Sequence, residues 1–459
     1  MQNSAPFIQR FIYRPQNLLV MTFGGLIVVG TVLLSLPVSQ QIAEDGTPIG
    51  ILDSFFTATS AVCVTGLITH DTATAYSRFG QSVILVLIQL GGLGIMTFAA
   101  IAASVLGRRM SFGSHEALGV VFFQGDNTGD LVRSLRRILG LTLCLEAVGA
   151  ALIYWGMRMI DFESSIFDAV FLAISAFCNA GFSTYSDSVI KLSSSWLAFW
   201  TLLFLIFFGG IGYTVLMEML LRFTTRRNVH RNVSVRWSLN SRVALWMSGL
   251  LIVAGAVAIA ILGVQPSSPL SLFDRCRHAL FQSITARTAG FNSVSIQGLP
   301  TASLLILIPL MFVGGSPGSC AGGVKTTSIA VWFAQLRNRL RGIEDVVIFE
   351  RRLPLDIVRR ARLLISIAIL WNAIGVFVLV LSEGFKGEFA FEDLIFEQVS
   401  AFATVGLSTG ITGELSVVGK LWIVASMFVG RLGPLTVALV VLQRPRQHVS
   451  YPHERVMIG

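Results

Sequence analysis

Two short glycine-containing segments recur four times along this chain, and no other feature of the sequence restricts its fold as strongly. The first segment occupies residues 60–67, 175–182, 284–291 and 400–407. Its glycines Gly66, Gly181, Gly290 and Gly406 are separated by 115, 109 and 116 residues. The second segment, at residues 91–94, 209–212, 314–317 and 430–433, begins 24 to 28 residues after each of these glycines. The repetition predicts a chain built from four related units.

The composition places these units in a membrane. Hydrophobic residues make up 54% of the 459 residues and charged residues only 13%, whereas soluble domains carry about a quarter charged residues. Apolar runs at 17–38, 82–106, 196–221 and 361–381 reach the length of about 20 residues at which a helix crosses a bilayer. The intervals between the runs are too short for a soluble domain of about 100 residues. We therefore expect an all-α polytopic membrane protein without an extramembrane catalytic domain.

Each unit also contains an apolar run that is too short to cross a bilayer. These runs lie at about 51–63, 166–178, 271–286 and 391–403, and the first glycine segment follows each of them. Irregular backbone at membrane depth is tolerated only where it is buried in protein or lines a water-filled cavity. The pattern therefore predicts four pseudo-symmetric helix/pore-loop/helix repeats around one central pore. The expected repeats are 1–107, 108–222, 223–340 and 341–459, the last including a cytoplasmic tail.

The distribution of charge predicts the orientation. The N-terminus, the C-terminus and the linkers 107–137, 222–242 and 335–362 hold 24 of the 34 basic residues. Because short cytoplasmic loops carry the excess of Lys and Arg, both termini are expected in the cytoplasm. The opposite face holds 15 of the 25 acidic residues, which would concentrate cations there. The net charge of +9 thus reflects membrane topology, and no nucleic-acid partner is expected.

The glycine loops are candidates for an ion filter. A ring of backbone carbonyls can replace the hydration shell of a cation, and glycine allows the dihedral angles that such a loop requires. Alternatively, the glycines could merely let helices pack closely. Close packing does not explain why each of the four glycines follows a short helix. The candidate filter residues are Val64, Thr65, Gly66, Asn179, Ala180, Gly181, Thr288, Ala289, Gly290, Thr404, Val405 and Gly406.

These residues, together with segments 314–327 and 428–434, resemble the Trk/Ktr/HKT superfamily of potassium transporters over nearly the whole chain, and within it the membrane subunits of bacterial Ktr systems. The resemblance implies a bacterial cytoplasmic (inner) membrane protein, a homodimer among membrane lipids, and a cytoplasmic regulatory ring. That ring would bind ATP/ADP or NAD(H), leaving no cofactor in this chain. Members that favour sodium have serine in the position of Gly66, so potassium is the implied substrate. Cys320 departs from the Ser or Thr expected there.

The third repeat contains a candidate gate. Residues 301–340 are too many for one span, and glycine and proline interrupt them at costs of about 1 and 3 kcal/mol per residue in a helix. An intramembrane loop at 314–323, facing the pore below the filter, is expected; a simple kink is the alternative. The candidate gate residues are Gly314, Gly315, Ser316, Pro317, Gly318, Gly322, Gly323 and Lys325. Val324 separates Gly323 from Lys325, so the pattern is not a nucleotide-binding P-loop.

Ionisable residues at membrane depth suggest further roles because they are costly there. Arg431 takes the place of a glycine of the other repeats and is expected either to form an electrostatic barrier in the pore or to brace the filter through hydrogen bonds or a salt bridge with Glu218. Arg287 is expected to brace the filter from behind by donating to loop carbonyls. Glu146 and Glu218 are expected to pair with basic side chains. All six histidines are expected in loops or tails, which disfavours a haem or metal site.

Features of the sequence discriminate among three classes of function. An intramembrane enzyme is disfavoured because no nucleophile–base pair is present. A secondary transporter of a larger solute is disfavoured because its repeats would have opposite topologies, whereas these four keep one orientation. Potassium translocation remains, gated by a regulatory subunit, and the sequence leaves open whether the chain is a channel or a sodium-coupled symporter.

Overall fold

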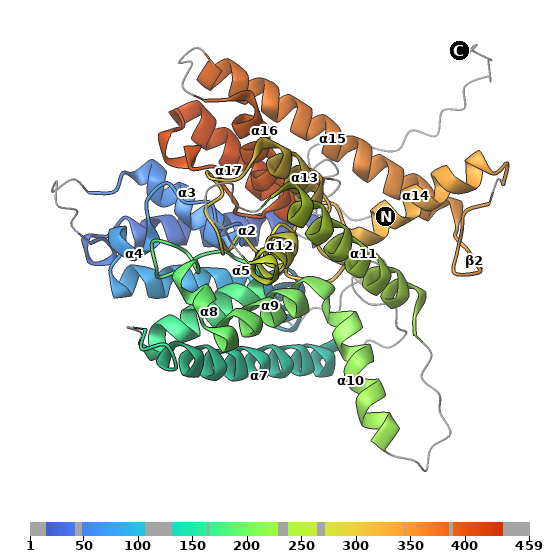
Figure 1. Ribbon diagram of the computed structural model, residues 1–459, viewed down its shortest axis with the longest axis horizontal. Helices are drawn as coiled ribbons and strands as arrows, with labels where there is room; N and C mark the ends of the chain where they lie inside the picture. The colour runs from blue at the N-terminus through green and yellow to red at the C-terminus, as the bar shows by residue number, and fades with distance from the viewer. Residues whose placement is uncertain are drawn as a thin grey trace, which may run out of the picture.

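The computed structural model describes residues 15–41, 48–105, 131–162, 165–227, 237–263, 271–343, 345–384 and 389–434, and these residues are largely helical (Figure 1). Within them, the one sheet is a hairpin of β1 (Val347–Ile348) and β2 (Arg351–Arg352). The helices of the first two repeats are α2 (Pro15–Leu34), α3 (Ile51–Val62), α4 (Thr72–Ala75), α5 (Arg78–Val105), α7 (Leu131–Arg158), α8 (Ile166–Cys178), α9 (Trp196–Ile211) and α10 (Tyr213–Arg227). Those of the last two are α11 (Leu239–Leu262), α12 (Leu272–Thr285), α13 (Thr301–Phe312), α14 (Thr326–Leu340), α15 (Leu355–Glu383), α16 (Phe391–Ala403) and α17 (Val417–Leu432).

The same order of a long helix, a short helix and a third helix occurs four times. The four short helices are α3, α8, α12 and α16, and they agree to within a residue with the predicted short runs. Local sequence explains their starts: Ser165 and Asp168 form a reciprocal capping box at α8, and the Ser271 hydroxyl accepts from the amide of Asp274 at α12. Asn179 and Thr404 end α8 and α16 in the left-handed conformation.

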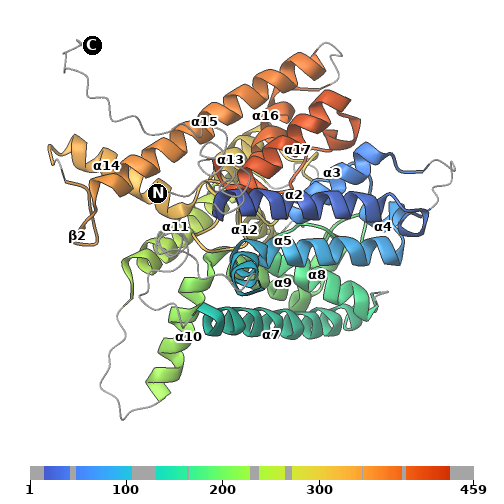
Figure 2. The same cartoon turned by 180° about the vertical axis from the view of Figure 1, so that it is seen from behind.

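Contacts between repeats close into a ring. The third helix of one repeat packs on the short helix of the next: α5 on α8, α9 on α12, α13 on α16, and α17 back on α3. In both views α7 and α15 lie on opposite sides of the ring, and α10 extends beyond α7 (Figures 1 and 2). The first and last repeats are therefore neighbours in space.

Length and composition make Arg136–Arg158, Leu239–Leu262 and Leu355–Glu383 candidate membrane spans among the residues whose side chains the structure describes. The apolar run 196–221, which was predicted to be long enough for one membrane-crossing helix, is interrupted. The chain breaks between α9 and α10 and bends by 106°, so that α10 projects away from the other helices (Figure 1). Gly212 makes this bend possible because its φ of +96° is unfavourable for other residues.

The predicted break in the third repeat is confirmed: α13 ends at Phe312, α14 begins at Thr326, and residues 313–325 form a non-helical loop. The proposed repeat boundary at 222–223 falls inside α10, and that at 340–341 falls at the end of α14. The boundary at 107–108, residues 107–130 of the first basic linker, residues 228–236 of the second and the predicted cytoplasmic tail after residue 434 lie outside the described residues.

Candidate functional site

All four short helices lead into loops with the same backbone conformation. In each loop, the residue two positions before the glycine of the first repeated segment has a positive φ although it is not glycine, which is uncommon in proteins. These residues are Val64 (+55°), Asn179 (+59°), Thr288 (+80°) and Thr404 (+51°). The glycines are also left-handed: Gly66 (+95°), Gly181 (+70°), Gly290 (+75°) and Gly406 (+91°). The sequence repeat is thus a repeat of backbone geometry.

The four glycines lie against one another in a closed ring. A Cβ atom added to Gly181 would stand 2.9 Å from the carbonyl oxygen of Ala289, which precedes Gly290. Gly66 faces the carbonyl of Ala180 in the same way, Gly290 that of Val405, and Gly406 that of Thr65. These contacts bring the candidate filter segments of all four repeats together around one axis. They also explain the glycines, because any side chain would collide with the neighbouring loop.

Hydroxyl groups behind the loops hold the backbone in place. The amides of Gly66 and Gly406 donate to Ser60 Oγ at 3.0 Å and to Ser400 Oγ at 3.2 Å. In the second repeat Ser175 Oγ donates to the carbonyl of Phe182 at 2.7 Å, and in the third Thr285 Oγ1 donates to that of Phe291 at 2.9 Å. The sequence prediction missed these side chains, although three of the four repeated segments begin with this serine.

The second glycine segment packs on the end of the short helix in its own repeat. Gly91 lies against the carbonyl of Val62, Gly209 against that of Phe177, and Gly430 against that of Phe402, in each case with no room for a Cβ atom. The third repeat departs from this pattern, since Gly314 lies against Gly322 of its own loop. The second segment therefore fixes the third helix of three repeats beside the ring.

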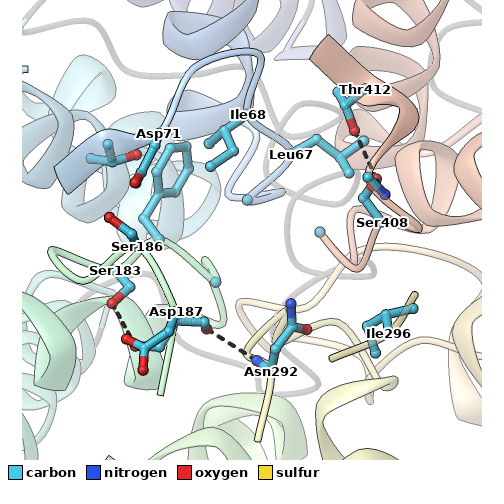
Figure 3. A pocket seen from close by; sticks show the side chains of 18 of the residues that line it. Leu67, Ile68, Asp71, Ser183, Ser186, Asp187, Asn292, Ile296, Ser408 and Thr412 are labelled. Carbon is cyan, nitrogen blue, oxygen red and sulfur yellow. Dashed lines mark hydrogen bonds between the residues drawn. The ribbon is translucent and has the colours of Figure 1, made fainter. Parts of the chain in front are cut away.

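A cavity of about 510 Å³ opens on one side of the ring, and all four ring glycines line it. Figure 3 shows polar side chains of its wall, among them Asp71, Asp187 and Ser408. Its walls come from the loops that follow the glycines in all four repeats. They include the carboxylates Asp71, Asp187 and Glu414 and many hydroxyl and amide groups. Such a cavity favours cations over anions near the ring.

Acidic residues anchor the short helices, and the sequence prediction did not single them out. The third residue of each is an aspartate: Asp53, Asp168, Asp274 and Asp393. Lys420 of the fourth repeat pairs with Asp53 of the first at 2.9 Å, and Arg78 of the first pairs with Asp168 of the second at 2.6 Å. Carboxylates are favourable in the first turn of a helix, and these two also connect neighbouring repeats.

The loop 313–325 docks into the bend between α9 and α10. The amides of Ser316 and Cys320 donate to the carbonyls of Gly210 and Gly209 at 3.0 and 3.3 Å, and the amide of Tyr213 donates to Gly318 at 3.0 Å. The bend leaves these helical groups without partners in the helix, and the loop satisfies them. Irregular backbone at membrane depth needs such partners.

The other side of the loop meets the fourth repeat. Gly322 lies against the side chain of Thr404, and Gly323 lies against Ala403. Lys325 turns back on the loop, where its Nζ donates to the carbonyl of Ala321 at 2.5 Å. Two of the predicted gate residues, Gly322 and Gly323, are therefore in direct contact with the glycine loop of the fourth repeat.

Arg431 connects three parts of the molecule. Its side chain is buried and donates to the carbonyl of Gly91 on α5 at 2.7 Å and to that of Cys320 in the loop. Within the described residues it has no carboxylate partner. The alternative of a salt bridge with Glu218 is wrong, because that carboxylate accepts from the amide of Ser238 instead. Neither carbonyl belongs to a glycine loop, so Arg431 joins α5 to the loop 313–325 and does not bond to the predicted filter, and the predicted barrier stays untested.

Three other predictions need correction. Arg287 does donate to a loop carbonyl, but to that of Gly314 and to Ser248 of α11 rather than to the ring. Glu146 is bonded to the Gln89 amide at 3.0 Å and, within the described chain, to no basic side chain. His278 lies buried inside α12, whereas a loop position was predicted. The partners of Arg287 and Glu146 come from other parts of the chain, so local sequence does not reveal them. His278 lies within the predicted short run 271–286, so its position in a helix could have been predicted.

A family model for cation transport proteins, TrkH, matches residues 15–450. The chain belongs to the TrkH family of cation transport proteins. It is 32% identical to the Ktr system potassium uptake protein B of Bacillus subtilis, with 97% of each chain covered. It is 34% identical to the protein of that name from Vibrio alginolyticus (96% and 94% covered) and 32% identical to the potassium/sodium uptake protein NtpJ of Enterococcus hirae (97% of each).

The fold is also that of a TrkH family member. The crystal structure of the potassium transporter TrkH from Vibrio parahaemolyticus matches with a TM-score of 0.72 and 19% identity, covering 94% of this chain and 85% of that one. The family consists of transport proteins rather than enzymes, in agreement with the sequence prediction. Its fold and the apolar spans identify the chain as a multi-pass membrane protein.

Proposed function

We propose that this chain carries K⁺ across the bacterial cytoplasmic membrane through the ring of its four glycine loops. The closed contact of Gly66, Gly181, Gly290 and Gly406 is the observation that carries this proposal. Relatives over nearly the full chain are named as potassium uptake proteins, which supports the choice of ion. The twelve residues of the loops would form the selectivity filter through their carbonyls.

The ring explains how an ion would shed its water. Backbone carbonyls substitute for the hydration shell, and the hydroxyls of Ser60, Ser175, Thr285 and Ser400 hold the loops in shape. Each loop has one glycine, whereas the TVGYG filter of potassium channels has two. We therefore expect fewer stacked carbonyl rings and weaker discrimination between K⁺ and Na⁺.

The loop 313–325 would act as the gate, through the residues 314–318, 322, 323 and 325. It touches the glycine loop of the fourth repeat and is bonded to the α9–α10 bend, so a shift of α10 would be transmitted to the ring. Arg431 would add a fixed positive charge beside the loop that limits flux when the gate is shut.

Regulation would come from a second protein. The exposed residues at the end of α14, on β2 and at the start of α15 form a basic face that fits a cytoplasmic regulatory ring with bound ATP/ADP or NAD(H). These residues are Arg337, Arg339, Arg341, Arg351, Arg352, Arg359 and Arg360. We propose that the chain itself binds no nucleotide, forms a homodimer, has both termini in the cytoplasm and couples K⁺ uptake to Na⁺.

Uptake of rubidium-86 by proteoliposomes, with K⁺ and Na⁺ varied separately, tests the function. We expect saturable uptake that K⁺ inhibits and that Na⁺ on the same side stimulates. Uptake that K⁺ does not inhibit would contradict K⁺ translocation. Uptake that is independent of Na⁺ would contradict only the coupling of K⁺ uptake to Na⁺. We expect uptake to respond to nucleotide only after a second subunit is added. Full regulation of the isolated chain by nucleotide would contradict the proposal of a separate regulatory subunit.

A further inference from the structure

Glu397 is a buried carboxylate for which the proposed filter has no evident use. It lies in the short helix α16 and is completely buried. In the described part of the chain no basic side chain forms an ion pair with it. The residues nine positions before the other ring glycines are Thr57, Leu172 and Phe281, so the carboxylate breaks the fourfold pattern. Burial of an ionisable group without a charged partner is costly, which points to a role.

Two hydroxyl groups separate this carboxylate from the polar cavity. Ser408 Oγ donates to Glu397 Oε2 at 2.8 Å, and Thr412 Oγ1 donates to Glu397 Oε1. Both residues line the cavity, and their side chains point toward each other there (Figure 3). Their oxygens are 2.9 Å apart. Glu397 itself stands one layer behind the wall.

The two hydroxyls can present oxygen lone pairs to the cavity that they line. Each hydroxyl carries one proton and two lone pairs, and both hydroxyls are placed to donate to Glu397. Their oxygens are 2.9 Å apart, and either one can also donate to the other. Ser408 Oγ accepts in addition from the amide of Gly410 at 2.9 Å. When both protons are donated to the carboxylate, the remaining lone pairs of the two oxygens can coordinate a cation.

We infer that Ser408 and Thr412, polarised by the buried carboxylate of Glu397, bind a monovalent alkali cation in the cavity before it reaches the ring. Oxygen ligands suit hard cations, and the charge of Glu397 would be neutralised through one layer of hydroxyls. The site rests on the proposed function, because it would supply ions to the same path, but it is separate from the carbonyl ring.

The test measures the concentration dependence of rubidium-86 uptake by proteoliposomes. Glu397→Gln, Ser408→Ala and Thr412→Val should each raise KM about tenfold, the change expected from losing one charge-assisted ligand interaction. The maximal rate and the preference for Rb⁺ over Na⁺ should stay unchanged, since the ring is intact. Thr57→Val is the matched control: it removes a buried hydroxyl, bonded to Tyr76 at 3.1 Å, from the equivalent position of the first repeat. Its KM should remain that of the wild type.

The outcomes separate the site from the function. An unchanged KM in the two hydroxyl variants, or equal KM shifts in Thr57→Val, would overturn the site, leaving Glu397 as a brace. The hydroxyl variants decide the question even where Glu397→Gln does not fold. Equilibrium binding of rubidium-86 to the purified chain gives the second readout. The wild type could bind Rb⁺ without transporting it, and the three substitutions could weaken that binding. This result would contradict the proposed function and support the site.

Discussion

At the scale of single residues, the ring depends on the absence of side chains. The carbonyl of Thr65 leaves no room for a Cβ atom at Gly406, whereas a Cβ atom at Gly181 would stand 2.9 Å from the nearest carbonyl. All four glycines also have positive φ, which adds roughly 1–2 kcal/mol of strain for any other residue. The four positions are therefore alike in conformation but differ in available space.

This difference predicts a graded response. Gly→Ser substitution at each of the four positions should raise the apparent K⁺ constant for uptake, with Gly406→Ser and Gly66→Ser more severe than Gly181→Ser. The measurement is inhibition of rubidium-86 uptake by K⁺. Gly140 in α7 has nothing within 4 Å of an added Cβ atom, so Gly140→Ser is the control and should transport normally. Unchanged K⁺ affinity in all four ring variants would show that the loops are not the filter.

Arg431 can be tested by separating its charge from its hydrogen bonds. We predict that Arg431→Gln raises maximal flux or leak with little change in K⁺ affinity, because the repelling charge is removed. Arg431→Lys keeps the charge but lacks the fork that reaches both Gly91 and Cys320, so it should keep low flux. Uptake and leak in proteoliposomes are the readouts. Loss of selectivity in both variants without a gain in flux would make Arg431 a brace alone.

At the scale of elements, the same short sequence has two outcomes. Residues 91–94 and 209–212 both contain three glycines with the same spacing, yet α5 continues through the first and the chain bends by 106° at the second. A Cβ atom at Gly94 would meet only the ring of Phe23, whereas one at Gly212 would stand 2.6 Å from the carbonyl of Pro317. Docking of the loop 313–325 thus decides the bend.

Substitution of Gly212 should release the docked loop. Gly212→Ala combines the strain of positive φ with a collision against Pro317, so we predict increased rubidium-86 leak through the closed state. Gly263 has a similar φ of +107°, but an added Cβ atom would meet only Pro300 at 3.9 Å. Gly263→Ala should therefore lose about 1–2 kcal/mol of stability without leak. Equal leak in both variants would argue against loop docking as the cause.

Sequence could predict the short helices because their apolar runs are short and end at a glycine segment. It could predict the break in α13–α14 because six glycine and proline residues interrupt it. It could not predict the bend after α9, since the apolar run 196–221 continues through it and the cause lies 105 residues away at Pro317. The partners of Arg431 and Glu146 were missed for the same reason. Contacts between repeats leave no local pattern.

At the scale of the whole molecule, ion pairs join repeats that are distant in sequence. Lys420 and Asp53 are separated by 367 residues, and their side chains are only 13% and 18% exposed. His70 adds a second contact to Asp53 at 3.6 Å. This pair fastens the fourth repeat to the first.

Breaking that pair should loosen the ring. Lys420→Met leaves the largely buried Asp53 without its closest partner, and we predict a loss of roughly 1–3 kcal/mol in stability. Thermal unfolding in detergent measures it. Arg352→Met breaks an exposed pair with Asp345 at 2.8 Å and should cost less than about 1 kcal/mol. Equal effects of the two changes would mean that the Lys420–Asp53 pair does not hold the repeats together.

The closure of the fourth repeat on the first has a consequence for how the chain is made. Thr65 leaves the ribosome more than 300 residues before Gly406, its neighbour in the ring. Until the fourth repeat is made, the loop of the first repeat lacks its contact with Gly406, and its polar backbone is without that neighbour in the incomplete chain. The ring of glycine loops can therefore close only after the fourth repeat has been made. A nascent chain that stops early inserts helices into the bilayer without opening a selective route across it.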